Sequence, residues 1–278
     1  MLAMIFFNFA ITAAASNTST PVSKASMDPL LDLSIEELMN IKVTTVSRRE
    51  QKLSNTPSAI FVITQDDIRR SGATSIPEAL RMAPGVEVAR VGTDKWSISV
   101  RGFNGRYANK LQVLMDGRSV YTPLFSGVIW SQQDTLMEDI ERIEVIRGPG
   151  ATVWGANAVN GVINIITKKA ADTQGMLVTA GGGSFEHGFV GMRYGGKINE
   201  DTPFRVYAKG FSRDNTTSLS GNNLHDNWHS ARGGFRLDHT NGINQLTLQG
   251  DLFINRIGDS LLQPSLISPF TKLDIVDA

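Results

Sequence analysis

The stretch GPGATVWGANAVNGVINIIT, residues 148–167, has no charged side chain and is followed at once by two lysines. Twenty uncharged residues are about the length that a helix needs to cross a bilayer. A membrane helix would not contain four glycines, a proline and three asparagines, as this stretch does. Its last third, residues 162–167, is rich in β-branched residues. We therefore expect a glycine-rich loop that leads into a short buried strand.

The amino-acid composition excludes several kinds of binding site. The chain has 278 residues, 27 acidic and 27 basic side chains, and no cysteine. Nucleic acid is not expected as a partner, because phosphate binding needs an excess of basic residues. The lack of cysteine excludes disulfides and thiolate metal sites. The sequence predicts no cofactor and no bound metal.

The N-terminus resembles an export signal. Residues 1–20 read MLAMIFFNFAITAAASNTST, an apolar run followed by small residues, and cleavage is expected after Ala15. No lysine or arginine precedes the apolar run, so a buried N-terminal strand or helix is the alternative. Residues 16–49 are then expected to form a linker.

Residues 50–169 have the pattern of one small α+β domain. A strand is expected at residues 59–64, followed by a helix that Thr64 and Asp67 cap and by a second helix that begins near Pro77. Further strands are expected at residues 86–90, 97–101, 111–115, 118–121 and 141–148.

The segments beyond Lys169 alternate with a period of two residues. In FRVYAKGFSR, residues 204–213, apolar or small residues occupy one face and mainly basic residues the other. The segments at 231–239 and 245–255 alternate in the same way, as strands of an outer-membrane barrel do with lipid outside and water inside. A long polar connection at 215–228 and a tight turn at 241–242 also fit the two ends of such a barrel.

Three segments resemble catalytic motifs but lack essential residues. GPGATV, residues 148–153, lacks the third glycine of a dinucleotide-binding loop, and GMRYGGKI, residues 191–198, has Ile198 where a P-loop needs serine or threonine. HDNWH, residues 225–229, spaces two histidines like a zinc protease, but an aspartate replaces the glutamate. The sequence therefore predicts no catalytic residue, and the protein is not expected to be an enzyme.

Three ordered motifs carry a family resemblance: ISVRGF at 98–103, LQVLMDGRSVY at 111–121, and DIERIEVIRGPGATVWGANAVNGVINIITKK at 139–169. With the alternating strands that follow, the chain resembles a TonB-dependent outer-membrane receptor over about residues 41–256. The resemblance implies an α+β plug domain inside a transmembrane β-barrel of about 22 antiparallel strands. The first of these strands would occupy residues 170–278, so we expect an incomplete, N-terminal fragment. Such a fragment is not expected to transport alone, because lipid does not tolerate open sheet edges.

The resemblance also implies a function. An extracellular nutrient, most often an iron–siderophore complex, would bind at the plug apex and the barrel rim. The inner-membrane TonB complex would then pull an N-terminal segment and rearrange the plug, while lipid of the outer membrane surrounds the barrel. The glycine-rich stretch would pack its backbone closely against neighbouring walls. The alternative is a secreted, soluble, plug-like binding or signalling module.

Site residues follow from the positions of the family motifs. The segment matching the TonB box is IKVTTVS, whose extended backbone could join TonB by β-augmentation; it comprises Ile41, Lys42, Val43, Thr44, Thr45, Val46 and Ser47. The expected ligand-binding residues are Trp96, Arg106, Tyr107, Tyr121, Phe125 and Trp130, although half of these aromatic residues could be ordinary packing residues.

Two arginines match the family's plug–barrel lock. Arg101 and Arg147 would pair with barrel glutamates according to the resemblance. In a chain without those glutamates, we expect both arginines to face water or local acids such as Glu144, because an unpaired buried guanidinium is costly.

Overall fold

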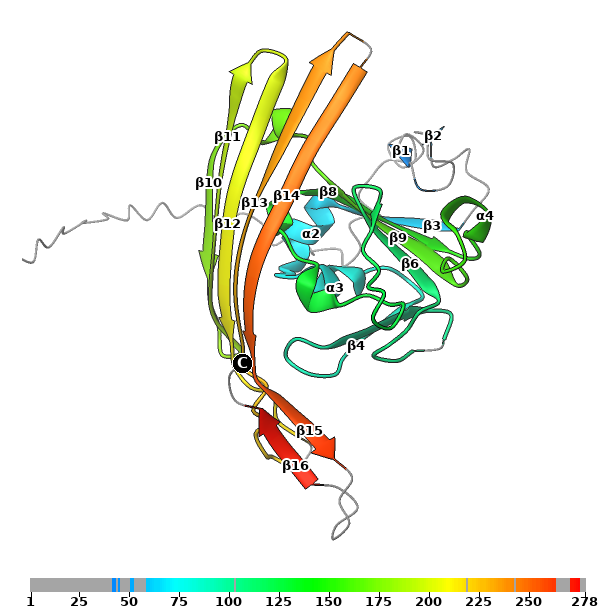
Figure 1. The fold of residues 1–278 in the computed structure, drawn as a ribbon, viewed down its shortest axis with the longest axis vertical. Coiled ribbons are helices and arrows are strands. Elements are labelled where there is room, and N and C mark those ends of the chain that lie inside the picture. The colour runs from blue at the N-terminus through cyan, green and yellow to red at the C-terminus, as the bar shows by residue number, and fades with distance from the viewer. Residues whose placement is uncertain are drawn as a thin grey trace, which may run out of the picture.

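The computed structural model describes residues 42–43, 45, 51–52, 59–102, 104–218, 220–242, 244–263 and 271–275. In these residues a small α+β domain lies beside a tall, curved antiparallel sheet, which we call the wall sheet (Figure 1). The expected signal sequence and most of the expected linker lie outside the described residues. No helix among the described residues is long and apolar enough to cross a membrane.

A five-stranded sheet forms the centre of the α+β domain. Its order is β3-β8-β9-β6-β7, and only the β6–β9 pair is parallel. The strands are β3 (Ile60–Thr64), β6 (Leu111–Met115), β7 (Arg118–Ser119), β8 (Ile140–Arg147) and β9 (Gly161–Thr167). Two separate two-stranded pairs join β4 (Val86–Arg90) to β5 (Trp96–Val100) and β1 (Lys42–Val43) to β2 (Gln51–Lys52).

Short helices cover this sheet. Helix α2 (Gln65–Ser71) has the expected capping box of Thr64 and Asp67, and Gly72 ends it in the left-handed region. Helix α3 (Ile76–Leu80) has a proline in its first turn, as expected. The remaining turns are the 3-10 helices η3 (Trp130–Gln132), η4 (Met137–Asp139) and η5 (Ala170–Thr173). Apolar side chains of α2, α3, η3 and η4 join those of the strands in one buried core.

The glycine-rich stretch is more ordered than a loop. A single helical turn, α4 (Ala151–Trp154), interrupts it before β9 begins. A Cβ atom at Gly161 would lie 2.5 Å from the carbonyl oxygen of Ile146, and one at Gly150 would lie 2.8 Å from Val162. The backbone is therefore closely packed, as expected, but against strands of the domain itself. Figure 1 shows α4 on the side of the domain away from the wall sheet.

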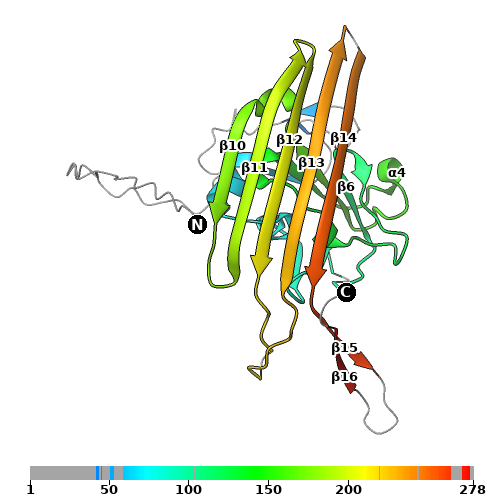
Figure 2. The same cartoon turned by 60° about the vertical axis from the view of Figure 1, so that its left-hand side comes forward.

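The wall sheet consists of five antiparallel strands in sequence order (Figure 2). They are β10 (Gly175–Gly181), β11 (Glu186–Asn199), β12 (Thr202–Arg213), β13 (Trp228–Asn241) and β14 (Asn244–Ile257). The expected alternation is present: Arg205 is 5% exposed on the face toward the α+β domain, whereas Leu252 is 83% exposed on the opposite face. A further hairpin, β15 (Asp259–Gln263) with β16 (Thr271–Ile275), follows the sheet.

The connections of the wall sheet differ at its two ends. Tight turns join β11 to β12 and β13 to β14 at one end, whereas the other end has the long connection between β12 and β13 as well as the short connection between β10 and β11 (Figure 2). The β4–β5 pair lies toward the end with the long connection, and β1 lies toward the end with the tight turns (Figure 1). The α+β domain therefore presents different segments to the two ends of the wall sheet.

Candidate functional site

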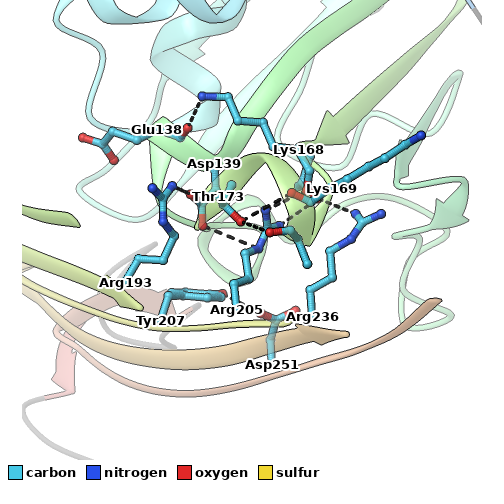
Figure 3. A network of polar contacts seen from close by, with 12 residues as sticks. Glu138, Asp139, Lys168, Lys169, Thr173, Arg193, Arg205, Tyr207, Arg236 and Asp251 are labelled. Carbon is cyan, nitrogen blue, oxygen red and sulfur yellow. Dashed lines mark hydrogen bonds and ion pairs between the residues drawn. The ribbon is translucent and has the colours of Figure 1, made fainter. Parts of the chain in front are cut away.

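A buried ionic contact joins the α+β domain to the wall sheet (Figure 3). Asp139 of η4 is fully buried, accepts a hydrogen bond from Arg193 of β11, and lies 3.7 Å from Nε of Arg205 of β12. The Arg205 guanidinium also donates to the carbonyl oxygen of Lys168 at 2.7 Å and to Oγ1 of Thr167 at 3.0 Å. One carboxylate thus holds two cations of the wall sheet against the edge of the domain.

Two further ion pairs also join a carboxylate of the domain to a cation of the wall sheet. The Lys209 ammonium lies 2.8 Å from Asp134 of the domain, and the Arg236 guanidinium lies 3.7 Å from Asp116. Arg232 donates to the carbonyl oxygen of Gln132 at 2.6 Å. The domain therefore contributes carboxylates and the wall sheet contributes cations.

This polarity is opposite to that of the expected lock. Arg101 is exposed at a φ of 59°, and the Arg147 guanidinium donates to the carbonyl oxygen of Pro84 at 3.2 Å. Neither arginine forms an ion pair with a carboxylate in the described part of the chain. Glu144, which we named as a local partner, is fully buried and pairs with Arg142 at 2.8 Å instead. Pairing of Arg101 and Arg147 with barrel glutamates stays a prediction.

The expected TonB box is described at Lys42, Val43 and Thr45, and Ile41, Thr44, Val46 and Ser47 lie outside the described residues. Val43 and Thr45 are both buried rather than free in solution. Lys42 and Val43 form β1, whose pairing with β2 uses part of the backbone that the expected augmentation would need. In this conformation Val43 and Thr45 are therefore docked, and the role of the segment as a TonB box stays a prediction.

Thr45 is held by three side chains of the domain. Its backbone N–H donates to Oε2 of Glu144 at 2.8 Å, and its hydroxyl group donates to the same oxygen. Asn164 donates to Oγ1 of Thr45 at 3.2 Å, and the Trp154 indole donates to its carbonyl oxygen at 2.5 Å. We call this arrangement the Thr45 clasp.

The sequence contained a signal for the Thr45 clasp that we did not use. Glu144 and Asn164 stand directly opposite each other on β8 and β9, and each is flanked in the sequence by two β-branched apolar residues. Polar side chains inside buried strands need partners, because an unsatisfied buried polar group is costly. This pair of polar residues indicated that another segment of the chain packs over the two strands and supplies hydrogen bonds, but not which segment.

The six expected ligand-binding residues divide into two groups. Tyr107 is 59% exposed, packs edge-to-face on Phe125 with 5.0 Å between the ring centroids, and lies under the guanidinium of Arg106 at 5.2 Å. We call these three residues the apical cluster.

The other three residues pack into the domain. Trp96 and Trp130 are buried in the core. Tyr121 packs against that core and donates its hydroxyl group to the carbonyl oxygen of Leu111 at 3.1 Å. Burial raises the pKa of Tyr121 to about 12. A ligand at the surface of this conformation would therefore meet the apical cluster before it met these three rings.

The long connection of the wall sheet is fastened to the turn between β4 and β5. Asp226 is buried and accepts from the backbone N–H groups of Thr93 at 2.9 Å and Thr216 at 2.6 Å. Burial alone would raise the pKa of Asp226, but the hydrogen bonds from Thr216 and Thr93 hold this pKa below its ordinary value. We noted this aspartate only as a mismatch to a zinc motif. No group of residues in the described part of the chain is arranged to hold a metal ion.

Comparison with known proteins gives the family. Residues 52–162 match the model of the TonB-dependent Receptor Plug Domain. The vitamin B12 transporter BtuB of Vibrio cholerae serotype O1 is 30% identical over 251 residues, a match that covers 88% of this chain and 39% of the relative. The iron-regulated outer membrane virulence protein of the same species is 39% identical over 132 residues, covering 46% of this chain and 20% of that relative. The chain thus spans well under half the length of these relatives.

Solved structures share the fold. The ferripyoverdine receptor of the outer membrane of Pseudomonas aeruginosa matches with a TM-score of 0.62 and 21% identity, covering 77% of this chain and 27% of the receptor. The ferric yersiniabactin uptake receptor of Yersinia pestis matches with a TM-score of 0.58 and 16% identity, covering 73% and 32%. At these identities the likeness shows the fold alone, an α+β plug followed by the first antiparallel strands of a transmembrane β-barrel.

The relatives and structural neighbours named above are transporters and receptors, not enzymes. The comparisons confirm the predicted fold class and the family resemblance of the ordered motifs. The chain belongs to the TonB-dependent receptors of the outer membrane.

Proposed function

We propose that the protein takes up a scarce nutrient across the outer membrane with energy supplied by TonB. The observation that carries this proposal is the position of the plug domain, which lies against the polar face of a sheet whose opposite face is apolar. A barrel strand has this two-sided character when lipid covers one face and a filled lumen the other. The exposed apolar face does not favour the alternative of a secreted soluble module.

We propose an iron–siderophore complex as the nutrient. The structural neighbours include receptors for ferripyoverdine and ferric yersiniabactin, and one relative is an iron-regulated outer membrane protein. In support, the apical cluster offers two exposed or half-buried rings and one cation to a bulky chelate. Vitamin B12 is a second candidate, because the BtuB transporters match a larger share of this chain.

The Thr45 clasp supports a role of the N-terminal segment in coupling to TonB. In the proposed cycle, Thr45 leaves Glu144 and Asn164, and the freed segment from Ile41 to Ser47 adds as a strand to the periplasmic domain of TonB. A strand addition needs free backbone donors and acceptors. The clasp and the β1–β2 pairing occupy several of these groups in the docked state.

Uptake in cells tests the function. We would measure accumulation of radiolabelled ferric siderophores and radiolabelled cobalamin in cells that produce the full-length receptor, with and without TonB. We expect uptake of a ferric siderophore that disappears without TonB. Uptake of cobalamin alone would replace the iron proposal with the second candidate. Accumulation of neither compound class would contradict both candidates, and TonB-independent accumulation would contradict the coupling.

A further inference from the structure

A cavity lies between the plug domain and the wall sheet, apart from the apical cluster. Its volume is about 380 Å³, and its lining comes from the α2–α3 connection, α3, β4, the β10–β11 connection and the ends of β11 and β12. Three arginines and two glutamates line it: Arg81, Arg90, Arg213, Glu78 and Glu186. We call this cavity the arginine crevice.

Arg90 enters the crevice from the plug domain on a support of aromatic rings. Its guanidinium carbon lies 3.9 Å from the ring centroid of Phe185 and 5.3 Å from that of Trp96. A ring under the plane of a guanidinium supports the cation and leaves the N–H groups in that plane for other acceptors. Arg90 donates to the carbonyl oxygen of Thr93 at 3.5 Å, and its Nε has no acceptor. No carboxylate in the described residues lies within ion-pair distance of Arg90.

Arg213 enters from the wall sheet in a similar way. It is 4% exposed, and its guanidinium carbon lies 4.6 Å from the ring of Phe211 and 5.1 Å from that of Trp228. Its Nη2 makes only long contacts, 3.4 Å to Glu186 and 3.3 Å to Oγ1 of Thr74. Its Nε has no acceptor either. A buried guanidinium normally has shorter, charge-assisted partners.

The crevice carries an excess of positive charge. Arg81 pairs with Glu78 at 2.9 Å, and Arg213 pairs loosely with Glu186, so Arg90 is left without a carboxylate. Burial and the nearby Arg213 lower the pKa of Arg90, and the carboxylates of Glu78, Asp226 and Glu186 offset this only in part. Two cations that repel each other across a partly enclosed space would both gain from an anion placed between them.

We propose that the arginine crevice binds a carboxylate or phosphate group between Arg90 and Arg213. Planar guanidinium groups match both oxyanions with paired N–H donors. One of these arginines belongs to the plug domain and the other to the wall sheet, so a bound anion bridges the two parts. The group could belong to a small free anion or to the acidic arm of a larger ligand. The proposal goes beyond the uptake function, since anion binding can be measured without transport.

Direct titration tests the crevice. We would titrate the purified protein in detergent micelles with inorganic phosphate and, separately, with citrate, and follow both heat and tryptophan fluorescence. Because the rings of Trp96 and Trp228 lie beside the two arginines, an anion in the crevice is expected to change the fluorescence. We expect saturable binding of at least one probe. Absence of saturable binding of both probes would overturn the proposal.

Substitutions locate the binding. Arg90→Gln should weaken it by about tenfold or more, because a charge-assisted contact is lost. Arg70→Gln is the matched control, because Arg70 is an exposed arginine of α2 that pairs with Asp66 outside the crevice. The affinity of this variant for the anion should equal that of the wild type. Equal weakening by both variants, or no weakening by Arg90→Gln, would contradict the site.

A second variant keeps the test decisive if Arg90→Gln does not fold. Phe185→Leu retains all charges but removes the ring under Arg90, so it should weaken binding by less than Arg90→Gln does. Unchanged affinity in folded Phe185→Leu would contradict the proposed support of Arg90. Binding of phosphate would point to a small oxyanion, whereas binding of citrate alone would point to a carboxylate arm of a larger ligand.

Discussion

The central sheet of the plug domain and the wall sheet each have five strands, but they bury their side chains in different ways. Every residue of β6 is buried, and β9 is buried along nearly its whole length, because helices and loops of the plug domain cover both faces. In β12, buried and exposed residues alternate. The plug domain thus builds its own core, whereas the wall sheet needs the plug on one side and lipid on the other.

The contacts between these two regions follow from that difference. The inner face of the wall sheet is rich in cations, so the plug domain docks largely through ion pairs and hydrogen bonds such as those around Asp139. Buried charges are tolerated only with partners, and each partner lost leaves a costly charge behind. Substitutions should therefore act differently in the plug, which apolar packing stabilises, and at the interface, which charged contacts stabilise.

The largest effect is expected at the interface. Asp139→Ala removes the carboxylate between Arg193 and Arg205 and leaves two buried guanidinium groups without it. We expect a loss of about 3–5 kcal/mol in docking or unfolding free energy. Urea unfolding in detergent micelles measures this loss, and Asp172→Ala is the control because Asp172 is exposed nearby. Similar unfolding midpoints for the two variants would contradict the docking role of Asp139.

A comparable loss is expected in the plug core. Ile143→Ala creates a cavity at a fully buried position and should cost about 2–5 kcal/mol. Leu252→Ala removes the same kind of side chain from the outer face of the wall sheet and should change stability by less than about 0.5 kcal/mol. Thermal unfolding of both variants checks the contrast. Equal losses would show that the outer face is packed like a core.

A smaller effect is expected at the Thr45 clasp. Glu144→Gln weakens charge-assisted bonds from Thr45 and Arg142, at a cost of about 1–3 kcal/mol. Residues 41–47 should then exchange their amide hydrogens faster and bind the periplasmic domain of TonB more tightly. Glu141→Gln changes the other carboxylate beside Arg142 and serves as the control. Unchanged exchange in Glu144→Gln would remove Glu144 from the coupling proposal.

The smallest effect concerns pH. The pKa of Asp226 is lowered in the folded protein, so its bonds to Thr93 and Thr216 add stability above the ordinary aspartate pKa of about 3.9. That stability is lost as the pH falls through the lowered pKa. Acidification from neutral pH should leave the hydrogen bonds of Asp226 to Thr93 and Thr216 intact until the pH is well below ~4. Hydrogen exchange at Thr93 measures this, and Asp226→Asn should abolish the pH dependence. A transition near neutral pH would contradict the assignment to Asp226.

The sequence predicted those features that depend on local periodicity. The alternation in FRVYAKGFSR is sufficient to assign Arg205 to the inner face and Val206 to the outer face, and the structure confirms both. The capping box at Thr64 was also predicted, because a few neighbouring residues determine it.

The remaining features depend on residues far apart in the chain. Thr45 and Glu144 are 99 residues apart, and no local pattern connects them. The polarity of the docking contacts was likewise beyond sequence reasoning, since Asp139 meets Arg193 only after both sheets have formed. Helix α4 was missed because its glycine-rich surroundings predict a loop, whereas the surrounding packing allows one helical turn.

A double-mutant cycle between Asp139 and Arg193 measures how strongly one ion pair between a plug carboxylate and a wall cation holds the plug against the wall sheet. Unfolding free energies of the wild type, Asp139→Ala, Arg193→Ala and the double variant give the coupling energy of this pair. We predict a favourable coupling of about 1–3 kcal/mol, so that the double variant loses less than the sum of the two single losses. Additive losses, with a coupling near zero, would contradict this role of the ion pair.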